Sequence, residues 1–207
     1  MKKIDLKKKL KPLYGTTRTQ GFVIVDVAPM NFLMVDGQGN PNTSQAFADA
    51  VEALYSMSYP LKFRVKKSPL ALDYGVMPLE ALWWTDDMAD FSPSNKDIWK
   101  WTVMIMQPEW ITAEMVEEVR NVTANKKDLP ALPRLRFESF DEGQAAQCLY
   151  IGPYADEAPT IQALHAFIEE NGFARRGKHH EIYLSDMRRT DPARLKTILR
   201  QPLADTS

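Results

Sequence analysis

The 207-residue sequence has one cysteine and almost no excess of either charge sign. A lone Cys148 excludes an internal disulfide framework and is typical of a reducing compartment, so we expect a cytoplasmic protein. The net charge of -1 differs from the basic excess of proteins that bind nucleic acid directly. No apolar run reaches about 18 residues, so we expect no membrane-spanning helix, and the lysine-rich start lacks the apolar segment of a signal peptide.

Histidine is also scarce, with three in the chain. His179 and His180 are adjacent in an apparent strand, where neighbouring side chains point to opposite faces and cannot readily bind one ion. The third histidine, His165, lies elsewhere in the sequence on a predicted helix. We therefore expect no bound metal ion. The Gly37-x-Gly39 pair lacks the rest of a phosphate-loop or dinucleotide fingerprint, and we expect no cofactor. The spacing shows no Ser–His–Asp or Cys–His arrangement, and Cys148, among apolar neighbours, is interpreted as a buried small hydrophobic residue.

Charge is unevenly distributed along the chain. Residues 1–20 carry seven basic side chains against Asp5. This basic N-terminal arm has two interpretations, a contact with an anionic surface or a solvated leader that packs through a few apolar residues. We favour the leader, because a basic run is usually a solvated face. Its packing residues would be Leu6, Leu10, Leu13 and Tyr14.

Aromatic residues are abundant, with 5 Trp, 7 Tyr and 9 Phe beside 10 Met. Such side chains suit flat apolar ligands because rings stack and thioethers adapt, although they also suit an ordinary core. All five tryptophans fall between residues 83 and 110, which is more than a small core needs. We expect at least two to line a cleft, with Trp84, Trp101 and Trp110 favoured, and Tyr55 and Tyr150 as secondary ligand-binding candidates.

The hydrophobic pattern predicts the same order of elements in each half of the chain. The predicted strands cover 22–27, 32–37, 72–85, 98–106, 134–140, 144–151, 178–186 and 195–201, and the predicted helices run from Thr43 or Ser44 to about Met57, from Thr112 to about Val122 and from Asp156 to Asn171.

Matched residues support an internal repeat. The helix stripes correspond at Phe47 with Ile161 and Leu54 with Ile168, and Met104–Pro108 corresponds to Ile198–Pro202. A looser match of 78–83 with 179–184 makes Glu80 and Glu181 near-equivalent carboxylates. Agreement in three places indicates a duplication.

The repeat predicts an α+β fold in which the two halves share one curved antiparallel sheet. Helices would cover one face, and the other face would form a ligand cleft at the pseudo-twofold axis. The predicted organisation is the basic arm at 1–20, one domain at 21–202 with repeats at about 21–127 and 134–202, and a loose tail at 203–207.

Strand alternation assigns chemistry to the run after residue 178. His180, Ile182 and Leu184 would face the helices, while Glu181 and Tyr183 would face the cleft, about 7 Å apart along the strand. The pair offers a carboxylate base and a phenol donor, and burial among aromatic rings would raise the carboxylate pKa toward neutral. The alternative is an ordinary surface Glu paired with Arg or Lys.

Two stretches resemble the GyrI-like small-molecule-binding family. They are H-H-E-I-Y-L-S-D-M-R-R-T-D-P-A-R-L-K-T-I-L-R-Q-P (179–202) and N-F-L-M-V-D-G-Q-G-N-P-N (31–42). The resemblance implies the two-repeat fold, which serves as the effector-binding domain of multidrug-sensing regulators and as a gyrase-inhibitory protein. Some stand-alone members are hydrolases of cyclopropane-bearing DNA-alkylating natural products. The Glu of their sites corresponds by position to Glu181, with Tyr183 beside it.

Three hypotheses therefore remain open. The first is a binder of flat hydrophobic or cationic small molecules, with Glu181 as a buried counter-charge and Glu80 in an undefined supporting role. The second is a cyclopropane hydrolase with Glu181 as general base and Tyr183 or a Trp N–H stabilising charge on the product. The third is a gyrase-interacting inhibitory protein. Residues 1–20 are too short for a helix-turn-helix, so we expect a small-molecule partner and no direct DNA contact.

Overall fold

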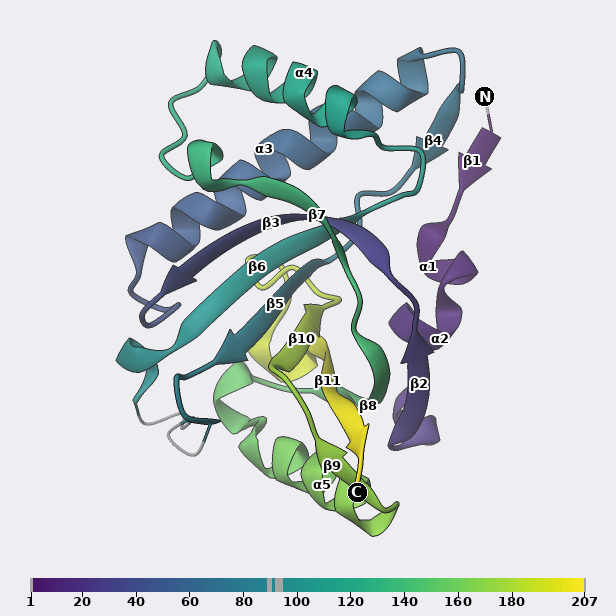
Figure 1. Ribbon diagram of the computed structural model, residues 1–207, viewed down its shortest axis with the longest axis vertical. Coiled ribbons are helices and arrows are strands. Elements are labelled where there is room, and N and C mark those ends of the chain that lie inside the picture. Colours follow the sequence, from purple (N-terminus) through teal and green to yellow (C-terminus); the bar gives the residue numbers. More distant parts are fainter. Residues whose placement is uncertain (1, 89–90, 92–94, 207) are drawn as a thin grey trace.

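The computed structural model describes the whole chain except residues 1, 89–90, 92–94 and 207. In the view of Figure 1, α3 and α4 lie toward the top of the large sheet and α5 toward its bottom, and the strand pairings place α3 and α5 on the same face. The helices are α1 (Leu6–Lys9), α2 (Lys11–Tyr14), α3 (Gln45–Lys67), α4 (Ala113–Ala124) and α5 (Ala158–Glu170), with short 3-10 turns η1 (Arg18–Gln20), η3 (Lys96–Ile98), η4 (Leu132–Arg134), η5 (Tyr154–Asp156) and η6 (Pro192–Arg194). The strands are β1 (Lys2–Ile4), β2 (Val23–Val27), β3 (Met30–Gln38), β4 (Leu72–Tyr74), β5 (Leu79–Trp84), β6 (Lys100–Gln107), β7 (Arg136–Phe140), β8 (Gly143–Ile151), β9 (Phe173–Arg175), β10 (His179–Tyr183) and β11 (Lys196–Asp205).

The main sheet joins the two halves of the chain. Its strand order is β2-β8-β11-β10-β5-β6-β3-β7, with β9 paired to β11, and all of its pairs are antiparallel. The halves meet where β5 pairs with β10. At the two ends the first strand of each half crosses to the other half, since β2 pairs with β8 and β7 pairs with β3. The predicted α+β fold with one antiparallel sheet is confirmed.

Two predicted element bounds are wrong for local reasons. The first long helix continues ten residues beyond Met57, because Leu61 and Val65 extend the same buried stripe. Pro60 lies inside that helix, where it removes one backbone hydrogen bond without ending it. The strand predicted over 72–85 is divided into β4 and β5, and β4 pairs with β1 instead of joining the main sheet.

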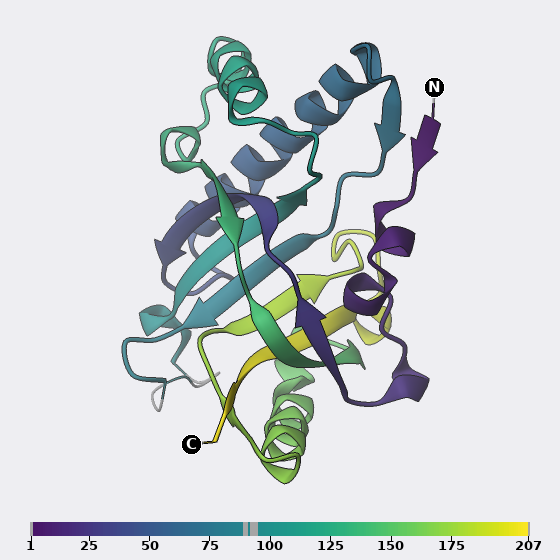
Figure 2. The ribbon, with the colours of Figure 1, turned by 45° about the vertical axis from the view of Figure 1, so that its right-hand side comes forward.

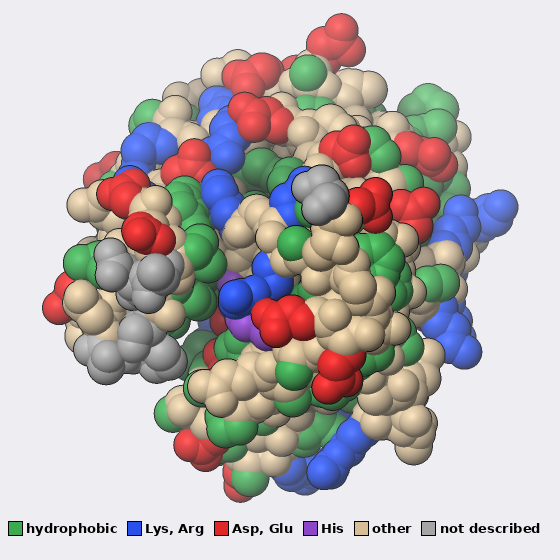
Figure 3. Space-filling model, turned by 60° about the horizontal axis from the view of Figure 1, so that its bottom comes forward, with side chains coloured by type: hydrophobic (Ala, Val, Ile, Leu, Met, Phe, Trp, Pro, Cys, Tyr) green, Lys and Arg blue, Asp and Glu red, His purple; other side chains and the backbone are tan. Residues whose placement is uncertain are grey.

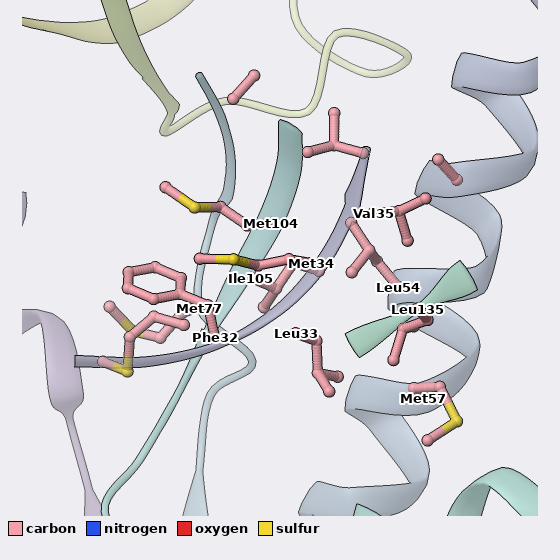
Figure 4. Packing of buried hydrophobic residues seen from close by; sticks show 14 of the residues in the cluster. Phe32, Leu33, Met34, Val35, Leu54, Met57, Met77, Met104, Ile105 and Leu135 are labelled. Carbon is pink, nitrogen blue, oxygen red and sulfur yellow. The ribbon is translucent and has the colours of Figure 1, made fainter. Parts of the chain in front are cut away.

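Both faces of the sheet are buried in the first half. Figure 4 shows Leu33 and Val35 of β3 on the side of Leu54 and Met57 of α3. Phe32 and Met34 lie on the opposite side of the strand, together with Met77 and Met104 in the same view. Alternating side chains therefore supply two apolar layers, one under the long helix and one on the other face.

The basic N-terminal arm covers part of the face opposite the long helices. Leu6, Leu13 and Tyr14 are buried in the main core. In Figure 2 this segment descends beside the sheet in purple, passing through the short helices α1 and α2. The lysines of the arm that follow Ile4, namely Lys7, Lys8, Lys9 and Lys11, are mostly exposed, as the solvated-leader interpretation expects.

The end of the chain differs from the predicted loose tail. Leu203–Asp205 belong to β11 and pair with β9, and Leu203 is 4% exposed in a small core with Leu164 and Ile168 of α5. The tail prediction is therefore wrong up to Asp205, and Ser207 lies outside the described residues. Within the described part of the chain, no helix combines the length and the apolar character that crossing a bilayer requires.

Candidate functional site

Glu181 lies in the middle of β10 and is 5% exposed. The Tyr183 hydroxyl donates to its Oε2 at 2.7 Å, and His179 Nε2 lies 3.4 Å from its Oε1. The Trp83 indole N–H donates in turn to the Tyr183 oxygen at 3.3 Å. His179, Glu181 and Tyr183 share a face of β10 because successive members are two residues apart, as strand alternation predicts.

The electrostatics of the site keep Glu181 ionised. Burial by itself would raise the pKa of Glu181, but His179, Tyr183 and Glu157 favour the charged form and hold the pKa below its usual range. Burial and the adjacent Glu181 charge raise the pKa of Tyr183 well above its ordinary value, so the phenol keeps its proton and remains a donor. The expected upward shift of the Glu181 pKa is therefore wrong, because its neighbours outweigh burial.

Glu181 faces the long helices, whereas the sequence pattern placed it on the opposite face. Glu181 is paired across the sheet with Leu199, which packs with Leu164 and Ile168 of α5. Paired residues share a face, so α5 lies on the Glu181 side. Figure 3 views the molecule from the α5 side, where basic and acidic side chains gather around a histidine.

The turn η5 and the N-cap of α5 contribute two residues, Tyr154 and Glu157, that the sequence did not single out. The Tyr154 ring meets the Tyr183 ring edge-on, with centroids 5.5 Å apart. The Glu157 carboxyl lies within hydrogen-bonding reach of the Glu181 carboxyl, and burial together with the Glu181 charge raises the pKa of Glu157 well above its usual range. No sequence pattern indicated a role for Glu157, because acidic residues are common at the starts of helices.

The aromatic wall beside Glu181 consists mainly of residues that were not favoured. Trp83 stacks on Phe47 of α3 with centroids 5.7 Å apart, and Trp83 also meets Trp99 at 5.5 Å. Phe91 stacks on Trp99 at 4.5 Å and lies 6.2 Å from the His179 ring. A flat apolar molecule bound near Glu181 would meet these rings.

The favoured tryptophans occupy three different positions. Trp101 is the cross-strand neighbour of Trp83 on the Glu181 face, where it is fully buried against Phe47. Trp84 points to the opposite face, because it follows Trp83 directly, and Lys178 lies over its ring at 3.3 Å. Trp110 packs edge-on against Tyr74 of β4, beyond the end of β6.

The two secondary tyrosines remain candidates. Tyr150 shares the Glu181 face, since the cross-strand row runs from Tyr183 through Thr197 to Tyr150, and its hydroxyl donates to the Pro153 carbonyl at 2.8 Å. Tyr55 is half-buried on α3 and stacks on Tyr59.

Glu80 is not equivalent to Glu181 and does not share its site. Glu80 pairs with Met104 while Ile182 pairs with Ile198. Because Met104 and Ile198 are equivalent, Glu80 corresponds to Ile182, one residue from the predicted match. A shift of one residue places a side chain on the other face of a strand. Glu80 is accordingly fully buried on the face opposite Glu181.

A buried ionic network surrounds Glu80 on that opposite face. His180 joins two carboxylates, with Nε2 3.0 Å from Glu80 Oε2 and Nδ1 2.7 Å from Glu142 Oε1. Arg200 donates to Glu142 Oε2 at 2.9 Å, and to the Leu13 carbonyl at 2.9 Å. The network thus connects the N-terminal arm to the sheet. His180 has a structural role in this network and is not part of the Glu181 site.

The remaining reactive groups carry no visible site chemistry. Cys148 is buried, and burial raises the pKa of its thiol to about 12, which makes it unreactive. In the described ranges, no three His, Cys, Asp or Glu side chains are grouped so as to hold a metal ion.

The antiparallel sheet that joins the two halves has the architecture of a small-molecule-binding domain. The sequence model of the GyrI-like small molecule binding domain matches residues 21–203, and the chain belongs to this family.

The solved structures include full-length relatives of this chain. A protein from Listeria innocua has a TM-score of 0.89 and 36% identity, covering 97% of this chain and 100% of its own. A hydrolase from Listeria innocua has a TM-score of 0.87 and 36% identity, covering 98% of this chain and 100% of its own. The EcmrR C-terminal domain shares the fold with a TM-score of 0.52 at 13% identity, covering 89% of this chain and 98% of its own. A comparison with curated proteins gave no match.

Proposed function

We propose that this protein is a hydrolase that opens a strained ring in a small hydrophobic molecule, with Glu181 as general base. The observation that carries the proposal is an ionised carboxylate, 5% exposed, held by Tyr183 at 2.7 Å beside a wall of aromatic rings. The lowered pKa makes Glu181 a weaker base than an ordinary Glu, but it keeps the carboxylate ionised at neutral pH and so able to accept a proton from water. The full-length similarity to a Listeria innocua hydrolase supports the reaction class.

The substrate class that fits this chemistry is a cyclopropane joined through a spiro carbon to a conjugated dienone. Glu181 removes a proton from water as the water oxygen bonds to a ring CH₂ carbon. The ring C–C bond breaks, and its electron pair moves through the conjugated system to the carbonyl oxygen. The resulting phenolate then takes up a proton, so one water is consumed for each ring opened. Tyr183 or the Trp83 N–H would stabilise the charge on that oxygen.

The test uses a spirocyclopropane dienone and follows the ring-opened product. The native protein should turn over the compound, and Glu181→Gln should lower the rate by about 10²–10⁴-fold, the usual contribution of a general base. Glu170→Gln, an exposed change on α5, is the matched control and should leave the rate unchanged. Absence of product with the native protein, or full activity in Glu181→Gln, would reject the proposal.

A second candidate function is capture of a flat cation without turnover. Its support is the same ionised carboxylate beside Trp83, since aromatic faces and a carboxylate together attract cations. Titration calorimetry with a planar aromatic cation distinguishes the two functions. Stoichiometric binding that Glu181→Gln weakens, with no product from the dienone, would favour the binding function over catalysis.

A further inference from the structure

The start of α5 brings a second carboxyl group to Glu181. Glu157 occupies the N-cap position of α5, yet its side chain makes no capping hydrogen bond to the helix. Its carboxyl instead lies within hydrogen-bonding reach of the Glu181 carboxyl. Its Oε2 is buried and has no hydrogen-bond partner among the described residues. Glu157 is thus directed away from the backbone that it would ordinarily cap.

Two carboxyl groups cannot form a hydrogen bond unless one of them carries a proton. The donors around Glu181 are already placed, because the Tyr183 hydroxyl donates to Oε2 and His179 Nε2 lies near Oε1. The cation whose charge reaches Glu157 is Lys96, and its ammonium lies over the Trp99 ring, 5.1 Å from the centroid. A proton on one of the two carboxyls would allow them to bond directly.

We propose that Glu157 and Glu181 share one proton, and that Glu157 is a positioning residue that keeps Glu181 as the ionised member of the pair. The neutral Glu157 carboxyl donates to the Glu181 carboxylate and offsets the cost of burying that charge. Any effect of this carboxyl pair on catalysis rests on the proposed function, whereas the shared proton itself does not.

The surroundings decide which carboxyl keeps the proton. His179 and Tyr183 on β10 favour a charged Glu181 through hydrogen bonds, whereas Lys96 acts on Glu157 through its charge alone. The titratable and charged groups that face the pair are His179 and Tyr183 from β10, Tyr154 from η5, Tyr150 from β8 and Lys96 from η3.

The shared proton predicts a rate that falls at both ends of the pH range. At low pH Glu181 gains a proton and ceases to be a base. At high pH Glu157 loses its proton, and two adjacent carboxylates repel each other. Glu157→Gln keeps a donor but cannot ionise, so it should retain the low-pH fall and lose the high-pH fall. Glu157→Ala removes the donor and should shift the low-pH fall toward higher pH.

The first experiment measures the dienone hydrolysis rate against pH in these variants. Glu169→Gln, an exposed change on the same helix, is the matched control and should keep the native profile. If hydrolysis depends on Glu181 but Glu157→Gln has the native profile at high pH, the inference is overturned and the proposed function stands.

The second experiment needs no substrate. The protein is labelled with ¹³C at glutamate carboxyl carbons and titrated by NMR, with Glu157→Gln and Glu181→Gln used for assignment. One carboxyl should titrate below the ordinary Glu range and the other above neutral pH, since a coupled pair loses its protons in two separate steps. Each variant should abolish the separation. Two carboxyls that both titrate near the ordinary Glu value would overturn the shared proton, whatever the activity.

Discussion

The Tyr14 hydroxyl donates to Glu80 Oε1 at 2.7 Å, and both side chains are almost completely buried. The bond connects the N-terminal arm to the strand at the centre of the sheet, on the face opposite Glu181. Burial and the Glu80 carboxylate raise the pKa of Tyr14 well above its ordinary value, so the phenol remains a donor. The arm is therefore held by a specific polar contact as well as by apolar packing.

Tyr14→Phe should lower the free energy of unfolding by about 1–3 kcal/mol, because it removes a donor from a buried carboxylate. Urea unfolding measures the change. Tyr59→Phe alters a tyrosine that is 49% exposed, and it should change stability by less than about 0.5 kcal/mol. Equal effects of the two changes would contradict a structural role for the Tyr14 bond.

The His180 network should give the fold a stability maximum at mildly acidic pH. Burial disfavours the His180 imidazolium, but Glu142 and Glu80 outweigh it and raise the pKa of His180 to about 9. This contribution is complete below the unfolded value of about 6.5 and is lost as pH rises through 9. Burial opposes ionisation of Glu142, yet His180 and Arg200 lower its pKa to about 2, so its contribution is lost as pH falls from about 4.5 toward 2.

Thermal unfolding between pH 2 and 10 tests this prediction. The Tm should be highest between about pH 4.5 and 6.5 and should fall on both sides. In His180→Gln the Tm should be lower throughout, with a weaker decrease on the alkaline side. An alkaline decrease of native size in that variant would show that another group causes it.

Gly37→Ala should destabilise the protein because of Trp101. A Cβ at Gly37 would collide with the Trp101 ring, which is fully buried and cannot move away. Overpacking of this kind costs about 1–3 kcal/mol. Gly75→Ala is the control, since a Cβ there meets no atom within 4 Å. Unfolding by urea should separate the two variants, and equal stability would refute the packing role of Trp101.

Trp83→Phe should lower hydrolysis about tenfold or less, if the proposed function holds. The change keeps a ring on Phe47 but removes the N–H that donates to Tyr183, a hydrogen bond worth about 0.5–1.5 kcal/mol. Trp84→Phe changes the neighbouring ring on the opposite face and should leave the rate at its native level. Steady-state rates on the dienone provide the comparison.

The pairing of Glu181 with Tyr183 followed from the sequence because strand alternation is local. Residues two apart share a face whatever the rest of the fold does. Which face they share depends on packing between distant elements, so the alternation could not place α5 on the Glu181 side. The equivalence of Glu80 failed for a related reason, since an error of one residue in register reverses the face.

The contact of Glu157 with Glu181 could not be predicted from the sequence for a different reason. The contact forms because the turn before α5 is packed over β10, and no local pattern encodes that distance. Composition alone does not choose between the adjacent Trp83 and Trp84, which strand alternation places on opposite faces, so it could not indicate that Trp83 lies on the Glu181 side. The element order and the sheet were predictable because periodicity and matched residues repeat along the chain.

The crossing of β2 and β7 makes the protein a single-chain counterpart of a strand-swapped dimer. Each half lends its first strand to the other, so a fragment containing residues 21–127 would leave β3 without its β7 neighbour. The connector at 129–133 therefore joins two interlocked units, each of which completes the other's sheet. Assembly of either sheet end must wait until the second half of the chain has been synthesised.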